Sequence, residues 1–347
     1  MAAESVLRFG ICGLGFMGRQ YFAHLRNDPH ARVVAVCDRD ADRRAGNWAD
    51  HVGNIGVTER GRVELAGIRA YAEPDALVAD VDVDVVAIAL PTPTHADLTV
   101  RALEAGKHVL CEKPMALTLE DCDRMLAAAE RTGRTLMIAQ CIRFWPQYEA
   151  IKQRVDAGRI GAVRFAALRR LASPPASFDN WMMDGERSGG ALFDLHVHDV
   201  DFAQYVLGLP ALLTAYGCRG ASGAIDHVVA TYGYPDGRYA TLEGGWIYHA
   251  PWFEMAITVV GETGTLDWLM SRGPEVYAYH GGVEPERITV SEETGWGREL
   301  DYFVDCLREG RPVERCLPAS SRANIALTLL ERESIESGRV VRVPPGL

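Results

Sequence analysis

The stretch VLRFGICGLGFMG, residues 6–18, decides the fold of this chain. Its first half is mostly apolar and predicts a buried strand, and the residues that follow it predict a helix over 19–26. Between strand and helix, Gly13, Gly15 and Gly18 form a G-x-G-x-x-G pattern. In this strand–turn–helix setting the pattern indicates a dinucleotide-binding turn.

Each position in such a turn has a physical reason. The first glycine makes the tight turn, the second lets the backbone approach the pyrophosphate, and the third lets the helix pack on the strand. The helix N-terminus faces the phosphates with N–H groups that have no partner inside the helix. The cofactor-binding residues expected from this stretch are Gly13, Gly15, Phe16, Met17 and Gly18.

Asp38 bears on the choice between NAD and NADP. A second apolar run, 31–37, predicts a strand that ends at this acid. An acid here accepts hydrogen bonds from the ribose hydroxyls and repels a 2′-phosphate, which favours NAD. The neighbouring Arg39, with Arg43 and Arg44, keeps NADP possible, because a guanidinium can accommodate the phosphate. We favour a solvated helix face for the three arginines, and count Asp38 and Arg39 among the cofactor-binding candidates.

Strands and helices alternate through the rest of the first half. Further strands are predicted at 68–71, 83–90, 109–111 and 135–139, and helices are predicted to open at Glu73, Ala96 and Thr118. Residues 53–67 combine glycines with mixed charge and predict a loop or small hairpin. The alternation predicts an α/β Rossmann domain with a doubly wound parallel sheet, which we place at residues 1–125.

Polar residues follow two of these strands where they end. In an open parallel sheet, ligands bind beyond the carboxyl ends of the strands. Pro114 disfavours the α region for Lys113, so we expect the lysine on an extended corner beside the cofactor rather than as a plain surface residue. For His95, contact with the nicotinamide ring and a role at the helix start are equally supported. The cofactor contacts expected at this edge are Pro91, Thr92, His95, Glu112 and Lys113.

The second half, residues 126–347, has a different pattern. Six short strands are predicted at 163–171, 212–218, 227–234, 239–247, 254–260 and 265–269. Asp236-Gly237 between two of them is a hairpin signal. The pattern predicts an α+β domain with a mostly antiparallel sheet, which we assign to substrate binding and oligomerisation. Two closing helices, about 298–337, are candidates for packing on the first domain.

A dense group of acids and histidines lies between the first two strands of this sheet. After Gly189-Gly190 the residues to Leu207 predict one continuous helix. At helical spacing, Asp194, His198 and Asp201 then share one stripe. A carboxylate four residues before a histidine can orient the imidazole and raise its pKa, as a general base requires.

Two other interpretations of this group compete, a solvated helix face and a metal site. The density of charged groups among apolar residues argues against the first. His196 and His198 are two residues apart, which places them on different faces of a helix, and no HExxH pattern accompanies them. We therefore expect no metal.

Composition limits the remaining function classes. The chain has 347 residues, 48% hydrophobic, with a formal net charge of −11, which argues against a nucleic-acid-binding surface. No apolar run approaches the ~20 residues of a membrane span. The first residues show no signal-peptide pattern. The eight cysteines form no CxxC pair and are expected to be reduced core thiols. We expect a cytoplasmic protein.

Taken together, these motifs resemble those of the glucose-fructose oxidoreductase, inositol dehydrogenase and rhizopine catabolism family. The resemblance rests on the glycine turn, the residues 91–95, Cys111-Glu112-Lys113-Pro114, and Ser188-Gly189-Gly190 followed by 194–198. It implies a Rossmann domain followed by an open-faced sheet domain, and assembly as a homodimer or homotetramer. It also implies NAD- or NADP-dependent oxidation or reduction of a sugar or cyclitol.

The resemblance also implies roles for individual residues. Lys113 matches the catalytic lysine of the family, and Asp194 and His198 match its catalytic pair. In the implied reaction, His198 accepts the hydroxyl proton, Asp194 holds the imidazole, and Lys113 stabilises the developing alkoxide. Arg143 is a substrate-site candidate on the same basis. For the loop residues Trp181 and Asp184, which are candidates independently of the resemblance, a place in the substrate pocket and a structural role are equally supported. His196 and the segment 53–67 depart from the commonest pattern.

Two alternative functions remain open at this point. One is a glycosidase or lyase that uses NAD transiently, which would show no net NADH. The other is a dinucleotide-sensing regulator, against which the set Lys113, Asp194 and His198 argues, because sensing needs no proton transfer.

Overall fold

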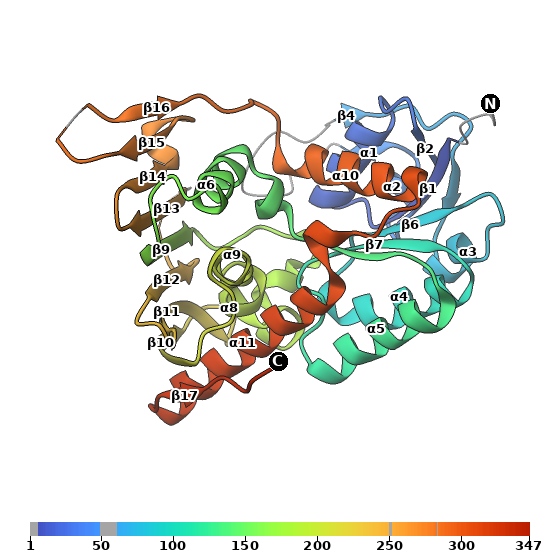
Figure 1. Ribbon diagram of the computed structural model, residues 1–347. Coiled ribbons are helices and arrows are strands. Elements are labelled where there is room, and N and C mark those ends of the chain that lie inside the picture. The colour runs from blue at the N-terminus through green and yellow to red at the C-terminus, as the bar shows by residue number, and fades with distance from the viewer. Residues whose placement is uncertain (1–5, 49–60, 250–251, 283) are drawn as a thin grey trace. The chain divides into compact units, whose positions relative to one another are not determined.

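The computed structural model describes residues 6–48, 61–249, 252–282 and 284–347 (Figure 1). The chain divides into two compact units. Unit 1 comprises residues 1–140, 176–181 and 296–322, and unit 2 comprises 141–175, 182–295 and 323–347.

Unit 1 is built on a six-stranded sheet in which every neighbouring pair is parallel. The strand order is β5-β2-β1-β6-β7-β8, so the chain runs outward from β1 in one direction and then in the other. The strands are β1 (Leu7–Cys12), β2 (Ala31–Cys37), β5 (Arg69–Tyr71), β6 (Val85–Ile88), β7 (His108–Glu112) and β8 (Leu136–Ala139). This order confirms the predicted doubly wound Rossmann architecture.

Helices cover both faces of this sheet, with α4 and α5 on one and α1 and α10 on the other (Figure 1). Their bounds are α1 (Phe16–Leu25), α2 (Ala41–Arg44), α3 (Pro74–Val78), α4 (His95–Glu104), α5 (Leu119–Thr132) and α10 (Gly295–Glu309). As predicted, Thr118 caps α5, accepting the N–H of Asp121 at 3.2 Å. Thr94 holds the same position before α4, but its hydroxyl donates to Pro91 O instead.

The boundary of the first unit differs from the expected residue 125, which lies inside α5. Strand β8 completes the sheet by pairing with β7, for example Ala139 with Glu112, so the first segment of unit 1 runs to Gln140. Helix α10 is also part of this unit, whereas α11 (Pro318–Ser337) is divided between the two. The short strands β3 (Asn47–Trp48) and β4 (Gly61–Arg62) pair with each other. Residues 53–60 of the predicted loop lie outside the described residues.

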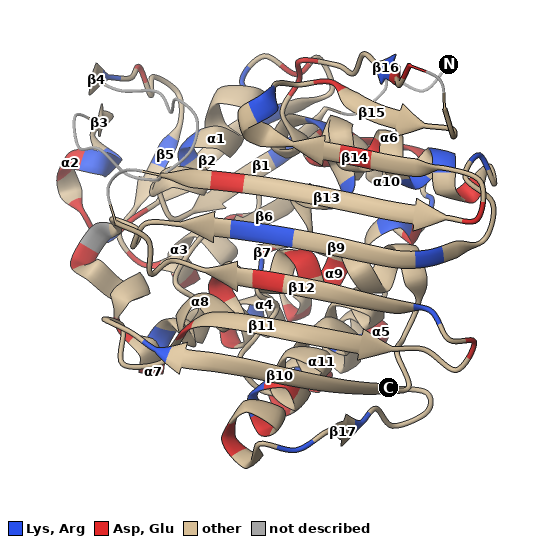
Figure 2. Ribbon diagram, turned by 90° about the vertical axis from the view of Figure 1, so that its left-hand side faces the viewer, with Lys and Arg blue, Asp and Glu red and all other residues tan. Residues whose placement is uncertain are grey.

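Unit 2 is built on a nine-stranded sheet, seen face-on in Figure 2. Its order is β16-β15-β14-β13-β9-β12-β11-β10-β17, and all neighbours are antiparallel except β9 and β12. The strands are β9 (Val163–Ala172), β10 (Leu212–Arg219), β11 (Ile225–Gly233), β12 (Tyr239–Gly245), β13 (Phe253–Gly261), β14 (Thr265–Leu269), β15 (Val276–Tyr279), β16 (Glu286–Ile288) and β17 (Val341–Arg342). The six predicted strands are all present, and Gly237 has the φ of +85° that the predicted turn requires.

The helices of unit 2 are α6 (Pro146–Asp156), α7 (Gly185–Ser188), α8 (Gly190–Asp194), α9 (Val197–Leu207) and most of α11. One face of each interior strand is buried, and the core includes Trp246 and Trp268. The opposite face carries exposed apolar side chains, among them Tyr216, Val229 and Tyr239. All eight cysteines are free, and only Cys218 is exposed. Within the described parts of the chain, no helix is long and apolar enough to span a membrane.

Candidate active site

The glycine turn of unit 1 has the geometry that a dinucleotide needs. Gly13 has a φ of +97°, and a side chain there would place its Cβ 2.3 Å from Ala89 O. A Cβ on Gly18 would lie 1.7 Å from Gly13 O, so this glycine lets α1 pack on the turn. A Cβ on Gly15 would meet no described atom within 4 Å. Gly15 is therefore not needed for packing within the protein, and the open space beside it fits a ligand that approaches the backbone.

Helix α1 begins directly after Gly15, which has no side chain to cap it. Its first-turn N–H groups thus remain for an anion. The Phe16 ring packs edge-to-face on Trp296 of α10, with ring centroids 5.3 Å apart. The first turn of α1 is therefore held in place by the closing helix of the same unit.

Asp38 is fixed beside this turn. Its Oδ2 accepts the N–H of Leu14 at 2.8 Å, and its Oδ1 accepts the N–H of Asp40 at 2.9 Å. Of the arginines after it, Arg43 does not lie on the solvated helix face we favoured, whereas Arg39 is exposed. Arg43 is 4% exposed with its guanidinium 3.9 Å from Asp38, and Arg39 forms an ion pair with Asp179 at 2.8 Å.

His95 lies between two strand ends. The imidazole is 1% exposed, and its nitrogens lie 2.9 Å from Pro114 O and 2.8 Å from Leu90 O. Burial lowers the pKa of His95, against the opposite effect of the two carbonyl oxygens. The ring links the end of β6 to the turn that carries Lys113, and it has little surface left for a nicotinamide ring. Pro91 and Thr92 begin the short helical turn Thr92–Thr94 beside it.

Lys113 follows the last residue of β7, as predicted, and the Lys113–Pro114 peptide bond is cis. The neighbouring Glu112 is buried, with Oε1 accepting the hydroxyl of Tyr21 and Oε2 accepting the N–H of Lys113 at 3.1 Å. Glu299 of α10 is fully buried, and burial together with the charge of Glu112 raises its pKa well above the usual range. Glu299 could not be recognised from the sequence, because a single acid in an amphipathic helix usually faces solvent.

The segment with Asp194 and His198 is not one continuous helix. Helix α8 ends at Asp194, and α9 begins at Val197. Between them, the N–H of His196 donates to Ala191 O, five residues back, at 2.8 Å. This widened turn is of the π type, which is common at functional sites. Asp194 is 7% exposed and His198 is partly exposed.

The widened turn breaks the predicted stripe of Asp194, His198 and Asp201. One member of the stripe, Asp201, instead forms an ion pair with Arg143 in the core of unit 2. Two other residues of the segment do the same, His196 with Glu331 and Asp199 with Arg170. Arg143 is 3% exposed and makes two bonds of 2.7 Å to Asp201. This arginine, expected near substrate, is thus a structural partner of α9.

Two further candidates lie in the segment 178–188. Trp181 is half-buried in the turn Phe178–Met183, which contains the left-handed residues Asp179 and Asn180. Asp184 caps α7, its carboxylate accepting the N–H of Glu186 at 3.2 Å. The capping contact gives Asp184 a structural role.

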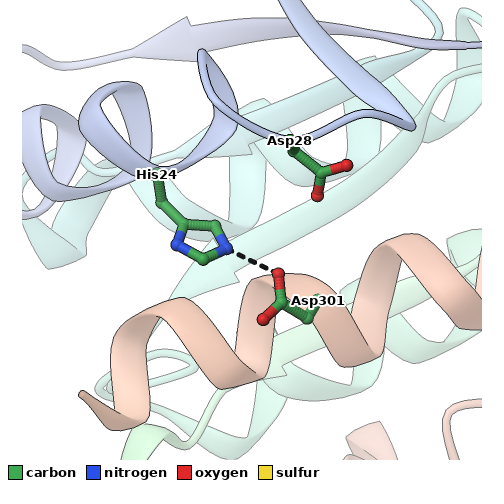
Figure 3. A group of neighbouring side chains, drawn as sticks. All are labelled: His24, Asp28 and Asp301. Carbon is green, nitrogen blue, oxygen red and sulfur yellow. Dashed lines mark hydrogen bonds and ion pairs between the residues drawn. The ribbon is translucent and has the colours of Figure 1, made fainter. Parts of the chain in front are cut away.

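One cluster in unit 1 has the residue types of a metal site: His24, Asp28 and Asp301 (Figure 3). Their candidate ligand atoms lie within 4.8 Å of one another. His24 Nε2, however, lies 2.5 Å from Asp301 Oδ1, the distance of a short hydrogen bond, and Asp28 Oδ1 accepts the N–H of His30. These contacts account for the cluster without an ion.

Comparison with known proteins finds a matching domain family in each half of the chain. The family described as "Oxidoreductase family, NAD-binding Rossmann fold" matches residues 7–140, and the GFO/IDH/MocA C-terminal domain matches residues 148–267. An uncharacterized oxidoreductase, ORF334, of Rhizobium meliloti is 34% identical over 243 residues, which cover 68% of this chain and 67% of that protein.

Inositol 2-dehydrogenase 2 of Saccharopolyspora erythraea is 33% identical over 241 residues, covering 68% of this chain and 63%, less than two thirds, of that enzyme. Among solved structures, an oxidoreductase domain protein from Kribbella flavida has a TM-score of 0.83 at 23% identity, covering 98% of this chain and all of that one. These matches confirm the resemblance inferred from the sequence motifs.

Proposed function

Because the chain belongs to the glucose-fructose oxidoreductase, inositol dehydrogenase and rhizopine catabolism family of NAD-binding oxidoreductases, we propose that it is a dehydrogenase for a secondary alcohol of a sugar or cyclitol. The observation that carries the proposal is the open glycine turn with a lysine at the end of β7 in the same unit. The similarity to an enzyme named as an inositol dehydrogenase supports the substrate class.

The residues that would hold NAD are Gly13, Gly15, the first turn of α1 and Asp38. When bound, NAD exchanges a hydride with the substrate carbon. The protein's task is then to bind and orient both molecules and to move the hydroxyl proton. We assign proton transfer to His198 as general base, with Asp194 orienting its imidazole, and stabilisation of the alkoxide oxygen to Lys113.

The roles proposed for Asp194 and His198 do not require the two residues to lie in one continuous α-helix. Asp194 ends α8 and His198 lies in the first turn of α9, on either side of the widened turn. Lys113 is in unit 1, and Asp194 and His198 are in unit 2, so each contribution can be tested separately.

The test is absorbance of the reduced nicotinamide, measured with NAD and with NADP over a panel of inositols, aldoses and deoxy-sugars. NADH formed with one sugar or cyclitol, and lost in Lys113→Ala, supports the proposal. Substrate consumption without net NADH would indicate the transient-redox glycosidase or lyase instead. NAD binding with no reaction across the panel would contradict a dehydrogenase of free sugars and cyclitols.

Asp38→Ala is expected to weaken NAD binding by about 1.5–3 kcal/mol, because a charged acceptor for Leu14 N–H and for the ribose is lost. NADP binding should suffer less, since the carboxylate no longer repels the 2′-phosphate. Calorimetry with both nucleotides measures the two changes, and Asp42→Ala, exposed on α2, is the control. Equal losses for NAD and NADP would show that Asp38 does not set the preference.

We also propose that the protein forms a homodimer or homotetramer through the outer face of the nine-stranded sheet. Tyr216 of β10 is 74% exposed and lies in register with Val229 of β11, which is 40% exposed. In Figure 2 the charged residues of the central strands lie on β9, β12, β13 and β14, whereas β10 and β11 carry them only near their ends. Contiguous exposed apolar side chains are typical of an interface.

Tyr216→Asp should therefore shift the protein to a smaller species in size-exclusion chromatography with light scattering. Val81→Asp is the control, since Val81 is 83% exposed on unit 1. An unchanged mass for Tyr216→Asp, or an equal shift for both variants, would place the interface elsewhere.

A further inference from the structure

The widened turn between α8 and α9 has its own support inside unit 2. His196, at the centre of the turn, is fully buried, and its Nε2 lies 3.2 Å from the carboxylate of Glu331 on α11. We propose that His196 is a positioning residue: its buried ion pair with Glu331 holds the widened turn and thereby sets the orientation of His198 relative to Asp194. The inference rests on the proposed function of those two residues and deepens it.

The surroundings of His196 are shaped for the imidazole. On β12, a Cβ at Gly244 would lie 2.6 Å from His196 Nδ1 and 2.7 Å from its Cβ, so only glycine leaves room for the ring. Glu331 is itself fully buried and accepts the hydroxyl of Tyr232 at 2.8 Å. Tyr232 and His196 both reach Oε1 of Glu331, so the tyrosine hydroxyl fixes the oxygen that His196 contacts.

Two further ion pairs hold α9 independently of His196. Asp199 accepts two bonds from Arg170 of β9, at 3.0 and 2.9 Å. Asp201 accepts two from Arg143, both at 2.7 Å. Both aspartates are fully buried, and a paired guanidinium fork fixes direction as well as distance. Because these two ion pairs hold α9, the position of Asp194 relative to His198 depends on the conformation of the turn at His196.

The charge state of His196 depends on the ionised side chains around it. Burial alone would favour the neutral ring, but Glu331, with a contribution from Asp199, raises the pKa of His196 above its usual value. Arg170 acts in the opposite direction. The positive charge of the imidazole, and with it the ion pair, is lost as the pH rises through this raised pKa.

Glu331→Gln tests the inference, since it keeps the shape of the acceptor and removes its charge. We expect kcat to fall about 10- to 100-fold with a smaller change in KM, because the reacting groups are misplaced rather than lost. The alkaline limb of the kcat–pH profile should move to lower pH, because the imidazolium loses its carboxylate. Thr328→Val is the matched control: Thr328 is buried on the same helix, and its hydroxyl bonds only Asn324 O among the described residues.

Gly244→Ala is a second test of the inference, because the added Cβ displaces the His196 imidazole without changing any charge. It should lower kcat as Glu331→Gln does. A kcat and a pH profile that match the Thr328→Val control in both variants would overturn the inference, because a merely structural role lowers stability without moving the profile.

The imidazole NMR signals of His198 give a readout that needs no turnover. We expect Glu331→Gln to shift them and Thr328→Val to leave them in place. If the sugar panel shows no turnover but the His198 signals shift, the proposed function fails and the positioning of His198 stands. If the unsubstituted protein turns over a sugar or cyclitol and Glu331→Gln does not shift the His198 signals, the positioning inference fails and the proposed function stands.

Discussion

Replacing Lys113 by alanine is expected to lower kcat about 10²- to 10³-fold, the usual effect of removing one donor from a developing oxyanion. Lys113 directly follows β7, and the neighbouring contacts of Glu112 and His95 fix the chain on both sides of it. NAD affinity, measured by calorimetry, should change much less than kcat, because the glycine turn and Asp38 remain. The measurement is steady-state kinetics with the best substrate of the panel.

Lys113→Arg is the informative companion variant. Arginine keeps the charge but places it on a longer, planar group, so a role in positioned hydrogen bonding predicts little recovery. Full recovery in Lys113→Arg would mean that only charge matters at this position. A Lys113→Ala enzyme with most of its rate would remove Lys113 from the mechanism.

Arg143→Ala is expected to destabilise the protein by about 3–5 kcal/mol, because it leaves the carboxylate of Asp201 buried without its partner. Replacing both residues with apolar ones, as in Arg143→Met with Asp201→Leu, should restore much of the loss, since no charge is then left uncompensated. The free energy of unfolding in denaturant measures both changes.

Asp156→Ala is the control for Arg143→Ala. It breaks an ion pair with Lys152 on the surface of α6, and such pairs are worth about 1 kcal/mol or less. If Arg143→Ala instead kept its stability and raised KM alone, Arg143 would be a substrate contact, as the family resemblance implied.

The fold could be predicted because its signals are local. Apolar runs marked the strands of unit 1, and Gly13 and Gly18 marked the turn between β1 and α1. The short strands β15 to β17 were missed because each has few residues and no clear alternation. The unit boundary was placed too early because the pairing of β8 with β7 cannot be seen in the sequence of either strand.

The surroundings of the candidate site could be predicted only in part, because they include buried ion pairs. Arg43 was expected on a solvated helix face and Arg143 near substrate, yet each is buried beside a carboxylate. For Arg143 that carboxylate is Asp201, far along the chain, and for His196 the partner is Glu331. Burial of a charge depends on such a distant partner, and a single sequence does not reveal it. The extra residue in the turn at His196 has no local signal either.

The pairing of β9 determines the order in which unit 2 can fold. Strand β9 pairs with β12 and β13, both of which follow it in the chain after a long interval. The pairings of β10 with β11 and of β11 with β12, by contrast, join sequence neighbours through short connections. Contacts between distant segments form slowly, because the chain must first close a large loop. During synthesis β9 is therefore made before either of its partner strands. The centre of the sheet can form only after β12 and β13 have been made.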